Sequence, residues 1–177
     1  MSESTRVLIA EFVSALKRGV RGRVSWVAPE NLHLTLHFFG EISERDADSL
    51  AAALEAAAAD LQPFIMGYGE FGAFPSLNRP NVIWLGLRRG AVETEALKAR
   101  LDDAIHGANG AFDDKRFHPH ITLGRARDPH LYLPDLKANV QTEDAVNEVI
   151  LMQSKLTPQG SHYTPLKRIG LGVAAHG

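Results

Sequence analysis

The stretch Leu32–Phe38 alternates apolar and polar side chains, which is the period of a half-buried strand. Because successive side chains of a strand point to opposite faces, His33, Thr35 and His37 are predicted to share one face. The leucines of the other face require a core. The polar face carries an imidazole and a hydroxyl about 6–7 Å apart along the strand.

A second His-x-Thr pattern follows much later, at His120–Gly124. His120 and Thr122 again share one face of a predicted strand, and the residues between and after them are apolar. One such pattern arises easily by chance, whereas two copies on predicted strands favour a single site built from both. The competing interpretation is two unrelated strands that each carry a surface histidine.

The segments around the two motifs, Trp26–Leu36 and Pro119–Arg125, resemble the LigT/ThpR branch of the 2H phosphoesterase superfamily, the RNA 2′,3′-cyclic phosphodiesterases. The resemblance extends along nearly the whole chain. It implies an α+β fold of two pseudo-twofold-related lobes, with antiparallel sheets facing a central cleft and helices outside. Residues 1–177 would then form a single domain of two interleaved lobes, with one motif in each.

Composition excludes several classes of protein. The 177 residues fit one domain, and the net charge of −2 argues against a protein that coats duplex nucleic acid by bulk electrostatics. The absence of cysteine excludes disulfides and thiolate metal sites and fits a reducing cytoplasm. No segment has the pattern of a membrane span or signal peptide, so we expect a cytoplasmic protein that does not bind membranes.

Apolar patterning predicts the elements between the motifs. Strands are expected at Thr5–Glu11, Val24–Val27, Pro63–Phe71, Val82–Leu87, Ala145–Leu156 and Ser161–Leu171. Helices are expected at Phe12–Val20, from Ser43 through the alanine-rich stretch to Asp60, and at Val92–His106. The breaker-rich segments are expected as loops or turns, with a helical turn in the third: Gly72–Pro80, Gly107–Arg116, Pro129–Asn139 and Thr157–Gly160.

Hydrolysis of a cyclic phosphodiester requires a base that deprotonates water and an acid that protonates the leaving oxygen. Two imidazoles suit this task because histidine titrates near neutrality, and the threonine hydroxyls can stabilise charge on the phosphate. No cofactor or metal ion is needed. His33 and His37 are not expected to share an ion, because roughly 13 Å of strand separates them. The resemblance implies His33 as general acid and His120 as general base, although the sequence alone does not distinguish the roles.

Other residues are candidates for the edge of this site. Arg125 would face away from His120 in a regular strand, but Gly124 permits a bend, and the resemblance implies that Arg125 reaches the phosphate. The competing interpretation is a solvated arginine at a strand end. His37 is a candidate third site or rim residue. The aromatic candidates for stacking on a base, each with core packing as the alternative, are Trp26, Phe74 and Tyr163.

The remaining aromatic and imidazole side chains have no such pattern. Trp84, inside an apolar run, is expected in the core. The histidines outside the motifs are expected to be surface or structural residues: His106, His118, His130, His162 and His176.

The predicted function is a metal-independent RNA 2′,3′-cyclic phosphodiesterase that leaves a 2′-phosphomonoester and has 2′-5′ RNA ligation as its reverse reaction. The expected partner is RNA with a 2′,3′-cyclic phosphate end or a cyclic nucleotide, bound by a monomer. Two alternatives remain open. One is a phosphodiesterase for 2′-5′ oligonucleotides or small cyclic nucleotide phosphates, and the other is an RNA-end binding module with little turnover.

Overall fold

The computed structural model describes residues 1–107, 117–134, 140–157 and 160–172. The chain divides into two compact units, each assembled from three separate segments. Unit 1 comprises Met1–Thr35, Ile65–Ala91 and His118–Asp144. Unit 2 comprises Leu36–Phe64, Val92–Phe117 and Ala145–Gly177. Among the described residues, no helix is long and apolar enough to cross a membrane.

Helix α1 (Glu3–Gly19) occupies the region where a strand and a short helix were expected. The predicted strand Thr5–Glu11 is wrong, because the buried residues recur with the spacing of one helical face rather than in one continuous run. Those residues are Thr5, Ile9, Val13 and Leu16. The Ser2 hydroxyl caps the helix by accepting from the backbone N–H of Thr5 at 3.2 Å.

Unit 1 is built on a sheet in the order β1-β4-β3-β2-β5. The pairs β1–β4, β3–β4 and β2–β3 are antiparallel. The strands are β1 (Val24–Trp26), β2 (Phe64–Ser76), β3 (Arg79–Arg89), β4 (His120–Ala126) and β5 (Glu143–Val146). The prediction that Val82–Leu87 is a central, buried strand is confirmed by the middle position of β3.

The segment Gly72–Pro80 is not the long loop that its glycine and prolines predicted. β2 continues to Ser76 and β3 begins at Arg79, with Ser76 paired to Arg79 across a tight hairpin. Sheet pairing therefore outweighs the local breaker signals here.

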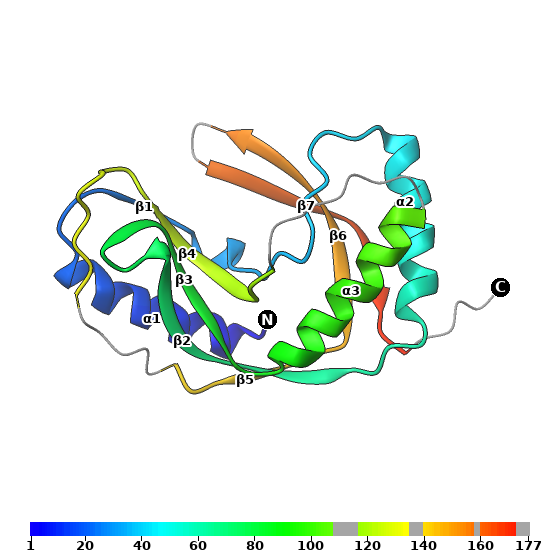
Figure 1. Ribbon diagram of the computed structural model, residues 1–177, viewed down its shortest axis with the longest axis horizontal. Coiled ribbons are helices and arrows are strands. Elements are labelled where there is room, and N and C mark those ends of the chain that lie inside the picture. The colour runs from blue at the N-terminus through cyan, green and yellow to red at the C-terminus, as the bar shows by residue number, and fades with distance from the viewer. Residues whose placement is uncertain (108–116, 135–139, 158–159, 173–177) are drawn as a thin grey trace. The chain divides into compact units, whose positions relative to one another are not determined.

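The core of unit 1 lies between α1 and one face of the sheet (Figure 1). Alternate positions of the central strands supply this face, as the period of a strand requires. Ile83 and Leu85 of β3 and Ile121 and Leu123 of β4 are completely buried. The opposite face carries the other parity, which includes both polar residues of the second motif, His120 and Thr122.

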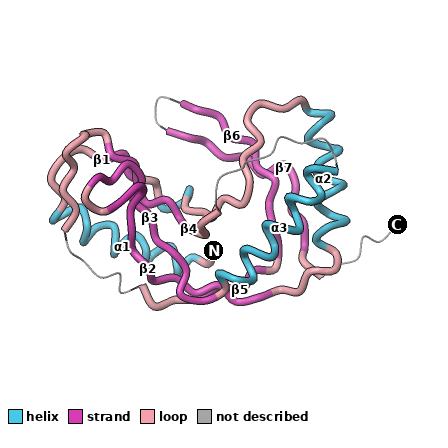
Figure 2. Tube along the Cα trace, viewed as in Figure 1, coloured by secondary structure: helices cyan, strands magenta, loops and turns pink. Residues whose placement is uncertain are grey.

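Unit 2 contains α2 (Glu44–Ala58), α3 (Ala91–Gly107) and a two-stranded sheet of β6 (Glu148–Thr157) and β7 (Gly160–Gly170). Its apolar core joins both helices to the hairpin (Figure 2). Ser43 caps α2 by accepting from the N–H of Asp46, which confirms the predicted start.

Three further outcomes concern the ends of predicted elements. The predicted strand Ala145–Leu156 is interrupted at Asn147, between β5 and β6. The predicted loop after Gly107 lies at residues 108–116, outside the described residues, as do residues 135–139 of the expected helical turn and residues 158–159 of the expected tight turn. The α+β class with antiparallel sheets is confirmed.

Candidate active site

The first motif does not form the regular strand that its alternation predicted. A short 3-10 helix, η1 (Pro29–Asn31), precedes it, and within the segment only Leu34 makes a bridge, which is antiparallel to Ile121 of β4. The apolar side chains of the alternating pattern pack into two different cores instead of one. Leu32 and Leu34 pack in unit 1, whereas Leu36 packs in unit 2. The prediction of one continuous strand face for His33, Thr35 and His37 is therefore wrong.

The Leu34–Ile121 bridge brings the two motifs together within unit 1. In an antiparallel register, the neighbours of a bridged pair also face each other. The register aligns His33 with Thr122 and Thr35 with His120. Because neighbours along an extended segment alternate in direction, we expect these four side chains on the face away from Leu34 and Ile121. In such an arrangement the Cα atoms of diagonal neighbours, here the two histidines, are about 7–8 Å apart. Both motifs fall in segments of unit 1, and the expectation of one motif in each lobe stays a prediction.

Both motif histidines are oriented by the same local hydrogen bond. His33 Nδ1 lies 2.7 Å from the carbonyl oxygen of Asn31, and His120 Nδ1 lies 2.6 Å from that of His118. Because a carbonyl oxygen only accepts, Nδ1 carries the proton in each ring. Nε2 is then the basic nitrogen of the neutral imidazole and the position from which proton transfer can occur.

The surroundings of His120 favour its neutral form. Burial of the ring is the largest cause of the lowered pKa of His120, and the positive charge of Arg125 contributes in the same direction. The hydrogen bond to the His118 carbonyl acts against the lowering of this pKa. A neutral imidazole at neutral pH is the form that a general base requires.

A bulge in β4 moves Arg125 to the face of the motif residues. Trp84 of β3 pairs with Thr122, whereas the preceding residue, Ile83, pairs with Gly124. β4 therefore contains one extra residue at this point, which reverses the parity beyond it. Arg125 pairs with Val82, whose side chain shares the face of Trp84. The bend that Gly124 permits thus brings Arg125 to the same face as His120 and Thr122.

The rings of Phe74, Trp84 and His118 form an aromatic wall beside His120. The edge of Phe74 meets the His120 ring at 5.1 Å between centroids, and Trp84 contacts Phe74 at 5.2 Å and His118 at 4.8 Å. Phe74 thus lies beside His120, and its role in stacking on a base stays a prediction. Trp84 is buried as expected, and it also belongs to the wall of the site. The backbone carbonyl of His118 orients the His120 ring. Sequence reasoning missed both of these roles.

Glycine makes room for the tryptophan of this wall. A Cβ atom at Gly72 would lie 2.2 Å from the Trp84 ring, and one at Gly86 would lie 3.0 Å from it. Gly72 is the cross-strand partner of Trp84, and Gly86 is two residues further along β3. Glycines at these positions, beside a tryptophan in an apolar run, are the sequence signal that could have indicated the wall.

The other candidates lie elsewhere. Trp26 packs against the core of unit 1, with Lys17 Nζ of α1 at 5.6 Å from its ring centroid, so the structure favours core packing over base stacking. His37 belongs to unit 2, where its Nδ1 is 3.1 Å from Asp102 Oδ1 and its side chain is only 6% exposed. Tyr163 lies on β7 of the same unit. The rim roles of His37 and Tyr163 stay predictions.

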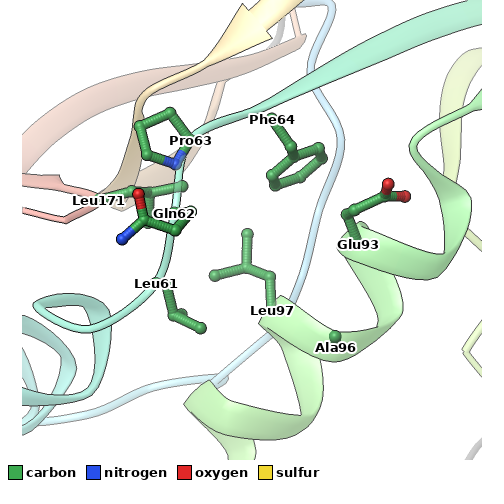
Figure 3. Close-up of a pocket in the computed structure, with 8 residues that line it drawn as sticks. All are labelled: Leu61, Gln62, Pro63, Phe64, Glu93, Ala96, Leu97 and Leu171. Atoms are coloured by element: carbon green, nitrogen blue, oxygen red, sulfur yellow. The ribbon is translucent and has the colours of Figure 1, made fainter.

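A cavity of about 370 Å³ in unit 2 contains none of the motif residues. In Figure 3, Leu97 of α3 points toward Phe64, and the remaining lining is mostly apolar. Within the described residues, no group of three or more His, Asp or Glu side chains is arranged to hold a metal ion.

Comparisons with known proteins indicate the family of this chain. The model of a family described as LigT like phosphoesterase matches residues 1–84, which include the first motif. An RNA 2′,3′-cyclic phosphodiesterase of Aquifex aeolicus is 32% identical over 173 residues, covering 93% of this chain and 92% of the relative. The enzyme of the same name from Escherichia coli is 35% identical over 150 residues, covering 82% of this chain and 78% of the relative.

A solved structure extends the similarity to the fold. The crystal structure of E. coli LigT complexed with 3′-AMP matches with a TM-score of 0.81 and 28% identity, covering 97% of this chain and 93% of that one. The similarity in sequence and fold therefore spans both His-x-Thr motifs, and the chain belongs to the LigT-like phosphoesterase family of 2H phosphoesterases.

Proposed function

We propose that this protein is an RNA 2′,3′-cyclic phosphodiesterase that acts without a metal ion. The observation that carries the proposal is the Leu34–Ile121 bridge, whose register sets an imidazole and a hydroxyl of one motif opposite a hydroxyl and an imidazole of the other. The names of the A. aeolicus and E. coli relatives support the reaction, and the complex of E. coli LigT with 3′-AMP supports a nucleotide ligand.

In the proposed reaction, Nε2 of neutral His120 takes a proton from water as the water oxygen bonds to phosphorus. The bond between phosphorus and O3′ breaks, and His33 transfers its proton to the departing O3′. The product is a ribose 2′-phosphomonoester with a 3′-hydroxyl. The lowered pKa of His120 supports its assignment as the base. His33, in protonated form, then has the role of the acid.

Negative charge grows on the non-bridging oxygens during this step. Thr35 and Thr122 are set opposite the two histidines and supply hydroxyl donors, and Arg125 supplies a guanidinium on the same face. Thr122 and Arg125 lie on β4, and donors held in place by a sheet stabilise the transition state without reorganisation at the moment of reaction. When a 5′-hydroxyl of a second RNA replaces water, the same proton transfers produce a 2′-5′ linkage. The cytoplasmic location and the monomeric state stay predictions.

The test is hydrolysis of a 2′,3′-cyclic mononucleotide and of a cyclic-ended oligonucleotide, with and without EDTA, with products identified by phosphorus NMR. We expect a 2′-phosphomonoester at the same rate in both conditions. His120→Ala, prepared in the same way, should form this product much more slowly and so controls for contaminating nuclease. Loss of turnover on chelation that a divalent ion restores would contradict the metal-independent mechanism. Tight binding without turnover would identify an RNA-end binding module.

A further inference from the structure

A second arginine follows Arg125 on the face of the motif residues. The ladder between β1 and β4 pairs Ser25 with Arg125 and Val24 with Ala126, and it continues with a hydrogen bond of 2.9 Å from the N–H of Arg127 to the carbonyl of Arg23. Because alternate residues share a face, Arg127 lies on the side of Ser25 and Arg125. The bulge that reorients Arg125 therefore reorients Arg127 as well.

A hydrogen bond directs the Arg127 side chain back along the sheet. Its Nε donates to the hydroxyl oxygen of Ser25 at 2.7 Å, and Ser25 is the cross-strand partner of Arg125. The Arg127 side chain is thereby held beside the cross-strand partner of Arg125. Among the described residues, no carboxylate forms an ion pair with Arg127 or Arg125.

The acidic residue nearest to Arg127 in the sequence is Asp128, and it forms an ion pair with Arg23 instead. Its Oδ1 lies 3.0 Å from Nη2 of Arg23, and its Oδ2 accepts from the backbone N–H of Arg23 at 2.6 Å. These hydrogen bonds lower the pKa of Asp128 and hold it as a carboxylate that neutralises Arg23. The positive charge of Arg127 is therefore left to face solvent on the side of the motifs.

The spacing of the two arginines fits neighbouring phosphates of one strand of RNA. Residues two apart on a strand are separated by about 6–7 Å, a distance of the same order as the span of one nucleotide in a single strand. Guanidinium groups bind phosphate oxygens with paired N–H donors and read no base. A 2′,3′-cyclic phosphate ends the RNA, so its only neighbouring phosphate is the one on its 5′ side.

We infer that Arg127, held by Ser25, binds the phosphodiester one nucleotide upstream of the cyclic end, so that the site prefers an RNA chain to a cyclic mononucleotide. This inference rests on the proposed function and specifies the substrate class of the same site. Arg125 contacts the reacting phosphate in this arrangement, whereas Arg127 contacts only its neighbour.

Three substrates test the inference. They are a 2′,3′-cyclic mononucleotide, a cyclic-ended dinucleotide, and the same dinucleotide with a neutral methylphosphonate as its internal linkage. We expect Arg127→Gln to lower kcat/KM about ten-fold on the charged dinucleotide, mainly through KM, and to leave the other two substrates unchanged. The slope of log kcat/KM against log salt should fall by about 0.7 on the charged dinucleotide.

Matched variants separate a local contact from net charge and from misfolding. Arg89→Gln removes the same charge from the same sheet, at a residue paired with Glu143, and should leave the preference for the charged dinucleotide intact. Ser25→Ala should reduce that preference in part, since it removes only the hydroxyl that holds Arg127. Equal losses with Arg127→Gln on all three substrates would overturn the inference.

A binding experiment keeps this test independent of turnover. We would titrate the protein with 3′-AMP and with a dinucleotide ending in a 3′-phosphate. Arg127→Gln should weaken only the dinucleotide, by about ten-fold. Equal affinity of the variant and the wild type for that dinucleotide would overturn the inference. Absence of hydrolysis with a retained Arg127 effect on binding would instead contradict the proposed function alone.

Discussion

Leu34 forms an antiparallel bridge with Ile121, and this pairing is the structural link between the two His-x-Thr motifs. Ile121 is fully buried in the core of unit 1, and Leu34 packs against that core. The apolar pair therefore anchors one face of each segment, and the polar neighbours of both residues are presented on the other face. The second motif is held by the pairing of β4 with β1 and β3, and the bridge ties the first motif to it.

The threonine hydroxyls are expected to act on the phosphate. Thr35→Val and Thr122→Val keep the shape of the side chain but remove a donor, so each should lower kcat by roughly 10²–10³, by analogy with oxyanion-hole donors. Steady-state kinetics on a cyclic mononucleotide measures the effect. Thr164→Val, at an exposed position of β7, serves as the control. Rates close to wild type in both motif variants would show that these threonines only complete the backbone arrangement.

The two histidines are expected to have separate roles. His33→Ala and His120→Ala should each slow hydrolysis by about 10²–10⁴. A substrate with a good leaving group at O3′ no longer needs the acid, so it should rescue His33→Ala substantially and His120→Ala very little. Rescue of His120→Ala instead would reverse the assignment, and equal rescue of both would mean that the roles are not divided in this way.

Arg125 is expected to influence the pH dependence through His120. Its positive charge contributes to the lowered pKa of His120, so Arg125→Met should raise that pKa. The base acts when deprotonated, and the acidic limb of kcat/KM should therefore move to higher pH in the variant. Arg89→Met, at a site paired with Glu143, should leave the limb in place. A shift of this limb toward lower pH would contradict this account.

The aromatic wall is expected to be sensitive to small additions. Gly72→Ala places a methyl group against the Trp84 ring, which must move together with its contacts to Phe74 and His118. Because displacement of a catalytic group by about 1 Å costs roughly 10²-fold, we expect kcat to fall by 10–10²-fold. Adding Trp84→Phe to Gly72→Ala should restore part of the loss, which a double-mutant cycle measures. No recovery would show that the wall does not support His120.

Asp144 is expected to stabilise the start of α1. Its carboxylate accepts from Tyr68 Oη at 2.9 Å, from Thr5 Oγ1 at 3.1 Å and from the N–H of Ser2 at 3.1 Å. Asp144→Asn should cost about 1–3 kcal/mol of unfolding free energy, measured by urea denaturation. Asp60→Asn, at an exposed position, should cost little.

The pH dependence of this stability follows from the same hydrogen bonds. Burial alone would raise the pKa of Asp144, but the hydrogen bonds from Ser2, Tyr68 and Thr5 outweigh it and lower the pKa. A lowered carboxyl pKa stabilises the fold above the unfolded value, and this stabilisation is lost as pH falls through the folded value. The difference in stability between wild type and Asp144→Asn should therefore shrink in acid. A constant difference would contradict the ionised acceptor.

Local patterns predicted the elements whose signals are contained within one segment. Ser43 caps α2, Val82–Leu87 is buried at the centre of the sheet, and β4 presents His120 and Thr122 on one face. In each case a cap, a continuous apolar run or a period of two was sufficient. The apolar run Val7–Ala10 misled because only comparison with Val13 and Leu16 reveals the period of a helix.

The sequence by itself determined which chemical groups the proposed site can use, because the paired His-x-Thr motifs supply two imidazoles and two hydroxyls wherever the chain places them. Only the tertiary structure decided their arrangement. The single bridge at Leu34, the extra residue in β4 that turns Arg125 and Arg127 to the motif face, and the tryptophan seated over Gly72 all depend on contacts between distant segments. Such contacts reflect pairing and packing in three dimensions, which no local period encodes.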